Sequence, residues 1–174
     1  MGAIVANRLT NANMYNDGAS LLGKCEEITL PSIKAKTSEH KALGMVMSLN
    51  IPSGFEAMNG KVKWNAIYPD LIAAFGSPYK TNKIQVRGNL ETWDAAGRTQ
   101  QQGVVAFLTV RFKDALPSIG LKQNDNSEQE SEYECSYYRL EVGGQKLIEI
   151  DAFAQIFFVN GTDELAGYRA ALGI

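Results

Sequence analysis

The chain has 174 residues, 45% of them hydrophobic, and a formal net charge of −2. This length and apolar content favour one domain, residues 1–174, with its own core, whereas the slight negative charge argues against a dedicated nucleic-acid-binding protein. No apolar run approaches the roughly 20 residues of a membrane-spanning helix. The N-terminus lacks the basic and apolar regions of a signal peptide, so we expect no secretion by that route.

The first forty residues indicate extended structure. Residues 13–23 surround Asp17-Gly18, a dipeptide typical of turns, and residues 24–40 are predicted to be extended with a break or an edge at Pro31. Three later segments alternate apolar and polar residues, which predicts strands. They are residues 60–68, 82–93 and 103–112.

Only two short helices are predicted. The first covers residues 68–76, with Pro69 in its first turn and Gly76 at its end. The second lies in residues 160–174, where Thr162 is the expected cap. Leu165, Tyr168 and Leu172 would form one apolar stripe on it, which predicts that this helix packs against something.

Two segments do not fit a compact sheet. Residues 39–60 are rich in Leu, Met, Ile and Phe but lack regular periodicity, so they are either a core-covering loop or an apolar arm that binds a partner. We favour the arm. Residues 122–134 carry five acids and no base after Lys122, which indicates a protruding acidic loop.

A hairpin is predicted between Tyr137 and Asp151, with Gly143-Gly144 as its two-residue turn. In the tightest register Glu141 lies opposite Lys146, Leu140 opposite Leu147 and Tyr137 opposite Ile150. Both faces of the hairpin would then be partly apolar, whereas an ordinary antiparallel sheet has one polar face. This register predicts a second cover, either a neighbouring subunit or the terminal helix.

The sequence provides no site for chemistry. Two cysteines, Cys25 and Cys135, and one histidine, His40, give neither a disulfide framework nor a closed zinc site, and we expect both cysteines to be buried. His40 has no nucleophile near it in sequence, and no glycine-rich phosphate-binding motif occurs. Glu149 and Asp151 would share a strand face, but an edge pair or an ion pair between subunits is a better explanation than acid–base catalysis. We therefore predict no catalytic, cofactor-binding or metal-binding residues.

Several motifs at the two ends of the chain resemble the major tail tube proteins of contractile-tailed phages, a family related to the tube proteins of R-type bacteriocins. The C-terminal pattern is a tyrosine-led strand, a glycine turn, an Ile-Asp strand end, Asn-Gly and a short helix ending in Leu-Gly. The matching residues are Tyr137, Tyr138, Leu140, Gly144, Glu149, Ile150, Asp151, Asn160, Gly161, Leu165, Gly173, and near the N-terminus Asn13, Asp17, Gly18, Gly23, Thr29, Leu30, Pro31, Lys34 and the pair Gly44-Met45. Residues 51–83 and the acidic loop depart from the pattern.

The resemblance implies a mainly β, sandwich- or barrel-like fold whose strands join those of neighbouring subunits in a continuous inner barrel. It implies a structural subunit without enzymatic activity or cofactor. Hexameric rings would stack into a hollow conduit for genome delivery, driven through the cell envelope by sheath contraction. The implied partners are other copies of the chain, the sheath protein, baseplate and tube-terminating proteins, the tape measure protein, and DNA passing through the lumen without sequence-specific binding. The implied location is the virion tail, assembled in the host cytoplasm.

Two alternatives remain open at this point. The chain could form a genome-free tube, as in an R-type bacteriocin or a contractile injection system, or it could be a monomeric β-sandwich binding module. An enzyme of unrecognised type comes last. Residues 1–87 carry a net +4 and residues 88–174 a net −6, which would suit two complementary surfaces on a polymer.

These considerations give specific expectations for contacts. The residues expected at subunit interfaces are Gly44, Met45, Leu49, Phe55, Met58, Tyr137, Ile148 and Ile150. The acidic loop, through Glu128, Glu130 and Glu132, is expected to meet Lys61, Lys63 or Lys80 of the next ring. Acids are expected to outnumber bases on the lumen wall, because a basic wall would bind DNA. Lys34 and Lys36 would oppose that expectation if they faced the lumen, since they share a face if their segment is a strand.

Overall fold

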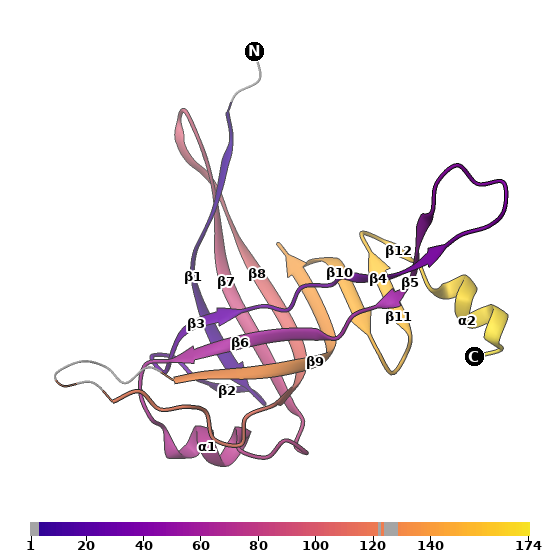
Figure 1. Cartoon of the computed structure of the whole chain (residues 1–174). Coiled ribbons are helices and arrows are strands. Elements are labelled where there is room, and N and C mark those ends of the chain that lie inside the picture. The colour runs from indigo at the N-terminus through magenta and orange to yellow at the C-terminus, as the bar shows by residue number, and fades with distance from the viewer. Residues whose placement is uncertain (1–3, 122, 124–128) are drawn as a thin grey trace.

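The computed structural model describes residues 4–121, 123 and 129–174 and consists mainly of β-strands (Figure 1). A long sheet runs in the order β12-β11-β10-β9-β8-β7-β1-β2. Its strands are β1 (Ala6–Asn16), β2 (Ala19–Ser20), β7 (Asn82–Asp94), β8 (Gly97–Phe112), β9 (Gln129–Val142), β10 (Gln145–Asp151), β11 (Ile156–Val159) and β12 (Thr162–Asp163). The two helices are α1 (Pro69–Phe75) and α2 (Ala166–Leu172). The expected mainly β fold with two short helices is confirmed.

The sheet branches at β9, which makes the fold barrel-like. The first half of β9 pairs with β6 (Met58–Trp64), and β6 pairs in turn with β3 (Cys25–Thr29). The second half of β9 pairs with β10. On the other side of β9, residues 104–112 of β8 pair with residues 133–142 of β9. The branch folds β6 and β3 over the β1-β7-β8 layer, and the core lies between the two layers (Figure 1).

Alternation along β6 determines what the branch buries. Val62 and Trp64 point into the core, whereas Lys61 and Lys63 point outward, as the sequence predicts. Helix α1 closes the end of the core with Leu71 and Phe75, and Phe75 stacks on both Trp64 and Phe112 at centroid distances of 5.7 and 4.3 Å. The predicted first helix, including Pro69 in its first turn and Gly76 at its end, is confirmed.

Residues 39–60 are not an irregular segment. β4 (Ala35–His40) and β5 (Leu49–Phe55) form a separate two-stranded hairpin, and residues 41–48 form its tip. The hairpin projects from the body near α2 (Figure 1). We call residues 35–55 the arm. The remaining residues of the expected segment belong to the link to β6 and to β6 itself.

The Gly143-Gly144 hairpin forms, but its expected register is wrong beyond the first two pairs. A bulge between Lys146 and Ile148 places Ile148 opposite Leu140 and Ile150 opposite Tyr138. Because a one-residue shift moves every later side chain to the other face, the bulge brings all four apolar residues to the core side. The second apolar face that we expected does not exist, so it needs no cover.

The second helix begins later than expected. Thr162 belongs to β12, and the cap position is Leu165, which makes no side-chain capping hydrogen bond. Gly173 ends the helix in the left-handed conformation at φ 75°. No residue of α2 is buried, and Tyr168 and Leu172 are more than half exposed. Arg169 holds the helix in place by pairing with Asp163 and by donating a 2.8 Å hydrogen bond to the Gln155 carbonyl.

Candidate subunit-contact surfaces

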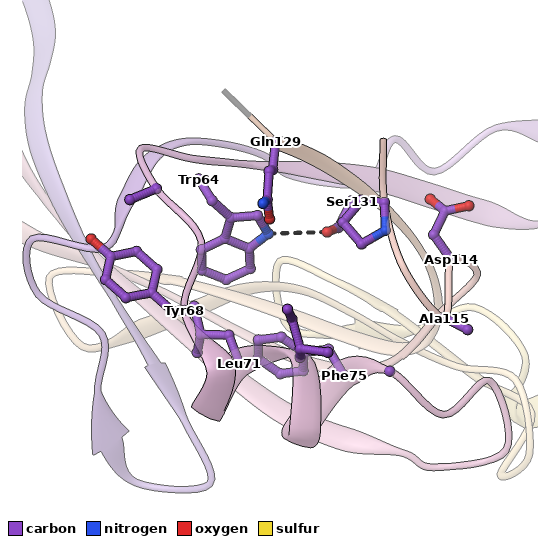
Figure 2. Close-up of a pocket in the computed structure, with 12 residues that line it drawn as sticks. Trp64, Tyr68, Leu71, Phe75, Asp114, Ala115, Gln129 and Ser131 are labelled. Carbon is purple, nitrogen blue, oxygen red and sulfur yellow. Dashed lines mark hydrogen bonds between the residues drawn. The ribbon is translucent and has the colours of Figure 1, made fainter. Parts of the chain in front are cut away.

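The enclosed pocket of the fold is too small for a cofactor or substrate. It lies between α1, β6 and β9 and measures about 20 Å³, room for about one water molecule (Figure 2). The Trp64 indole N–H donates a 3.0 Å hydrogen bond to the Ser131 hydroxyl on its wall. The buried Gln129 amide nitrogen also lines the pocket and has no partner among the described atoms. The pocket is therefore a packing feature of the core and offers no room for chemistry on a substrate.

The described residues give no candidate metal site. Within residues 4–121, 123 and 129–174, no group of three His, Cys, Asp or Glu side chains could hold a metal ion. Among the same residues, no helix is long and apolar enough to cross a membrane. The two cysteines are free; Cys135 is buried and Cys25 is partly buried. Burial raises the pKa of Cys25 to about 11 and that of Cys135 to about 12.

These shifts predict unreactive thiols in the folded protein. Since the thiolate is the reactive form, a thiol reagent at pH 8 is expected to label neither cysteine on the timescale that labels a free peptide thiol. After unfolding in guanidinium chloride, the same reagent should label two thiols for each chain. Rapid labelling of the native protein at either position would contradict the burial of Cys25 and Cys135 described above.

The arm exposes several large apolar side chains to solvent. Leu43 and Val46 at its tip are fully exposed, Met47 is 68% exposed, and Leu49 and Ile51 are nearly half exposed. Gly44 forms the turn with φ 87°, and Met45 follows it. Contiguous exposed apolar surface of this kind marks interaction sites. Gly44, Met45 and Leu49 thus lie where a partner can reach them, as expected.

Five other expected interface residues are placed differently. Met58 and Ile150 are 4% and 5% exposed and belong to the core, so the expectation that they dock on a neighbour is wrong. Ile148 packs against the same core. Phe55 packs on Phe157 at a centroid distance of 4.6 Å, and its role is to fix the base of the arm. Tyr137 lies on the polar face described below.

The ribbon of β1, β7 and β8 has two open edges among the described residues. β1 pairs with β7 along its length, but β2 covers its other side only at Tyr15 and Asn16. β8 pairs with β9 only from Val104 onward, so residues 98–102 pair with β7 alone in the described part of the chain. These edges lie on opposite sides of the three-stranded ribbon of β1, β7 and β8 that extends beyond the body (Figure 1). β8 begins at Gly97, earlier than the predicted strand of residues 103–112, although Asp94 and Gly97 bracket a turn.

The face of β7–β10 opposite the core is polar and nearly balanced in charge. The part of this face formed by residues 83–87, 105–109, 137–141 and 146–151 carries four bases and three acids. They are Lys83, Arg87, Arg139, Lys146, Glu141, Glu149 and Asp151. Aromatic rings on the same face support two of the bases: Arg139 lies over Phe107 at 4.3 Å and Lys146 over Phe158 at 3.8 Å.

Glu149 is the centre of this polar face. Burial opposes its ionisation, but hydrogen bonds from Lys146 Nζ at 2.6 Å and Tyr137 Oη at 2.7 Å outweigh burial and lower the pKa of the Glu149 carboxyl. Burial and the same carboxylate raise the pKa of Tyr137 to about 12. Glu149 is therefore ionised at neutral pH and paired with Lys146 of its own subunit, whereas the expectation was an edge pair or a pair between subunits.

The charges expected to join stacked rings are paired within one subunit. β6 and β9 lie side by side, so Lys61 contacts Glu130 at 2.7 Å and Glu132 at 3.4 Å. Lys63 contacts Glu26 at 3.3 Å. Residues 129–134 of the expected acidic loop are part of β9, and Glu128 lies outside the described residues. Lys61, Lys63, Glu130 and Glu132 thus have contacts within their own subunit or strand layer, and their role between rings stays a prediction.

Residues 6–173 match the family model of the phage tail tube protein FII. The chain belongs to this family. It is similar to the tail tube protein of Escherichia phage P2, with 29% identity over 173 residues that cover 96% of this chain and 97% of the relative. It is also similar to the major tail tube protein of Serratia phage KSP20, with 22% identity over 162 residues and 90% of each chain covered.

A solved structure titled as an extracellular contractile injection system, the PVC sheath-tube complex in its extended state, contains a chain that matches with a TM-score of 0.48. The identity is 15%, and the match covers 75% of this chain and 87% of that one. Family membership confirms the expectation of a tail tube protein, and the tail tube proteins of phages are components of the virion tail.

Proposed function

We propose that this tail tube protein assembles into hexameric rings that stack as the hollow inner tube of a contractile tail. Strands of neighbouring subunits pair along their open edges to close an inner barrel. The genome passes through the lumen without sequence-specific contacts, and contraction of a surrounding sheath drives the tube through the cell envelope. The structural role of the family favours a function without catalysis.

The open edges of the β1-β7-β8 ribbon carry this proposal. A long unpaired edge is a site for pairing with another chain, and natural monomers usually block such edges. Here one edge, on β1, faces one side of the ribbon, and the other, on β8, faces the opposite side at the same end. A contact between two different edges repeats from subunit to subunit, and closes into a ring when the rotation allows. Closure into a barrel removes both edges.

The proposed partners follow from this assembly. The outside of the tube would contact the sheath protein, its ends would contact baseplate and terminating proteins, and its lumen would hold the tape measure protein and then DNA. We propose that the polar face of β7–β10 lines the lumen. Two of the four bases named on this face pair with acids beside them, Arg139 with Glu141 and Lys146 with Glu149. We propose that such pairing, in place of the expected acid excess, limits binding of DNA to the wall.

Negative-stain electron microscopy of the purified protein at high concentration tests the proposal. We expect hollow rods or six-membered rings. A protein that stays monomeric at all concentrations would favour the alternative of a β-sandwich binding module. A genome-free tube, as in an R-type bacteriocin or an injection system, would give the same rods and is distinguished by whether purified particles that contain this chain also contain a DNA-filled head.

Neutralising the β9 acids tests whether charge directs ring stacking. In the Glu130→Gln/Glu132→Gln variant, we expect the free energy of unfolding to change by no more than about 1 kcal/mol, because exposed ion pairs contribute little. We also expect the salt dependence of polymerisation to match that of the parent, because Lys61 already pairs with both acids within the subunit. If polymerisation of the variant depended less on salt than that of the parent, these acids would contribute to contacts between rings.

A further inference from the structure

An apolar groove lies at the base of the arm, away from the open sheet edges. It has a volume of about 740 Å³ and lies between the base of the arm, the start of β6, the β10–β11 turn and α2. Its floor is apolar and includes Phe55, Met58, Ile150, Ile156 and Leu165. Tyr168 of α2, 56% exposed, forms one wall. We call it the arm groove.

The charges around the groove have one sign. Its lining residues include three acids, Glu56, Glu134 and Asp151, and no Lys, Arg or His. A segment that fits this groove therefore combines apolar side chains with a positive charge. α2, with no buried residue of its own, would gain packing from such a segment.

The arm has the chemistry that the groove requires. Leu43, Val46 and Met47 at its tip are the most exposed apolar side chains of the arm, and methionine adapts to irregular apolar surfaces. Residues 35–55 carry Lys36, Lys41 and one acid, Glu39, which gives a net charge of +1. Lys41 lies 3.0 Å from Glu39, so the unbalanced positive charge is that of Lys36 in β4. The tip is thus complementary to the groove in polarity, and the arm as a whole is complementary to it in charge.

The arm of the same subunit cannot fill the groove. Its base forms part of the groove wall, and its two strands run away from the body, so its tip lies at the far end (Figure 1). About ten residues separate the base from the tip, which is a reach of roughly 30 Å in extended conformation. That reach brings the tip to a neighbouring molecule.

We infer that the arm groove receives the arm tip of a second copy of this chain. Tip and groove are different surfaces of one subunit, so each copy gives its tip to the next and accepts one from the copy before it, a head-to-tail contact that propagates. This inference rests on the proposed tube function. It adds the surface on which each arm docks.

Disulfide trapping between two singly substituted subunits tests the inference. Subunits with Val46→Cys are mixed with subunits with Tyr168→Cys, assembled and mildly oxidised. All subunits also carry Cys135→Ala, because Cys135 is a free cysteine that lines the groove. We expect a covalent dimer in the assembled mixture. We expect little from either variant alone, or when Tyr79→Cys replaces Tyr168→Cys. Tyr79 is a matched control because it is 94% exposed and lies outside the groove.

Each other outcome points to a different conclusion. Tubes without the Val46–Tyr168 dimer would overturn the inference and leave the proposed function intact. A dimer from Tyr168→Cys alone would show that α2 meets α2 and would also overturn it. A parent protein that forms neither rings nor tubes would refute the proposed function itself, and the inference would fall with it. As a second readout, Tyr168→Asp should raise the subunit concentration needed for assembly at least tenfold, whereas Tyr79→Asp should not.

Discussion

Replacing Val46 and Met47 with Asp is expected to abolish tube assembly while the subunit stays folded. Both side chains lie at the exposed tip of the arm, with Val46 fully exposed and Met47 68% exposed. Burying one such side chain at an interface contributes roughly 1.5–3 kcal/mol, and a polymer repeats the loss at every subunit. Surface changes of this kind alter the free energy of unfolding by no more than about 0.5 kcal/mol.

Sedimentation of assembled material and chemical denaturation of the subunit measure the two effects separately. The matched control is Ser38→Asp, which adds a charge to an exposed position of β4, away from the tip, without removing apolar surface. The control should assemble. Phe55 is unsuitable for this test because it packs on Phe157, and its removal would disturb the body of the subunit. Tubes of normal length from the Val46→Asp/Met47→Asp variant would show that the arm is not an assembly element.

The arm also shows what sequence analysis can and cannot resolve. Its apolar residues were predicted to bind a partner as one group, but Met45 is partly exposed at the tip whereas Met58 is in the core. The alternation of Val62 and Trp64 extends back to Met58 in steps of two, so this signal could have separated the two methionines. The hairpin pairing of β4 with β5 had no comparable signal, because both strands are exposed and neither needs one apolar face.

Strand register is the second limit. The turn at Gly143-Gly144 was predictable from two glycines that adopt φ values of 58° and 80°. The bulge near Leu147 was not predictable, because its position depends on which side chains pack in the core, here Ile148 and Ile150. The same applies to the ion pairs of Lys61, which depend on the β6–β9 pairing of segments about 70 residues apart.

Gly60→Ala is expected to destabilise the subunit strongly. Gly60 lies in β6 directly opposite Tyr133 of β9, and the Tyr133 ring, 0% exposed, covers it. A Cβ at position 60 would lie 2.3 Å from Tyr133 Cζ and 2.6 Å from the Thr29 carbonyl oxygen, both far inside van der Waals contact. The ring cannot move easily, because its hydroxyl donates a 2.9 Å hydrogen bond to that same carbonyl. Overpacking costs typically about 1–3 kcal/mol, and a clash with backbone belongs at the upper end.

Urea denaturation of the parent and four variants tests the cause of this loss. Gly103→Ala in β8 is the matched control, because a Cβ there meets no atom within 4 Å, and it should change the unfolding midpoint little. Tyr133→Leu leaves a cavity and costs about 2–4 kcal/mol by itself. If the clash with the ring dominates, Gly60→Ala should cost at least about 1 kcal/mol less in the Tyr133→Leu background than alone. Strictly additive costs would instead assign the loss to the Thr29 carbonyl. Since β6 follows the arm directly in the chain, a subunit weakened here should also lose the fixed base from which its arm reaches a neighbour.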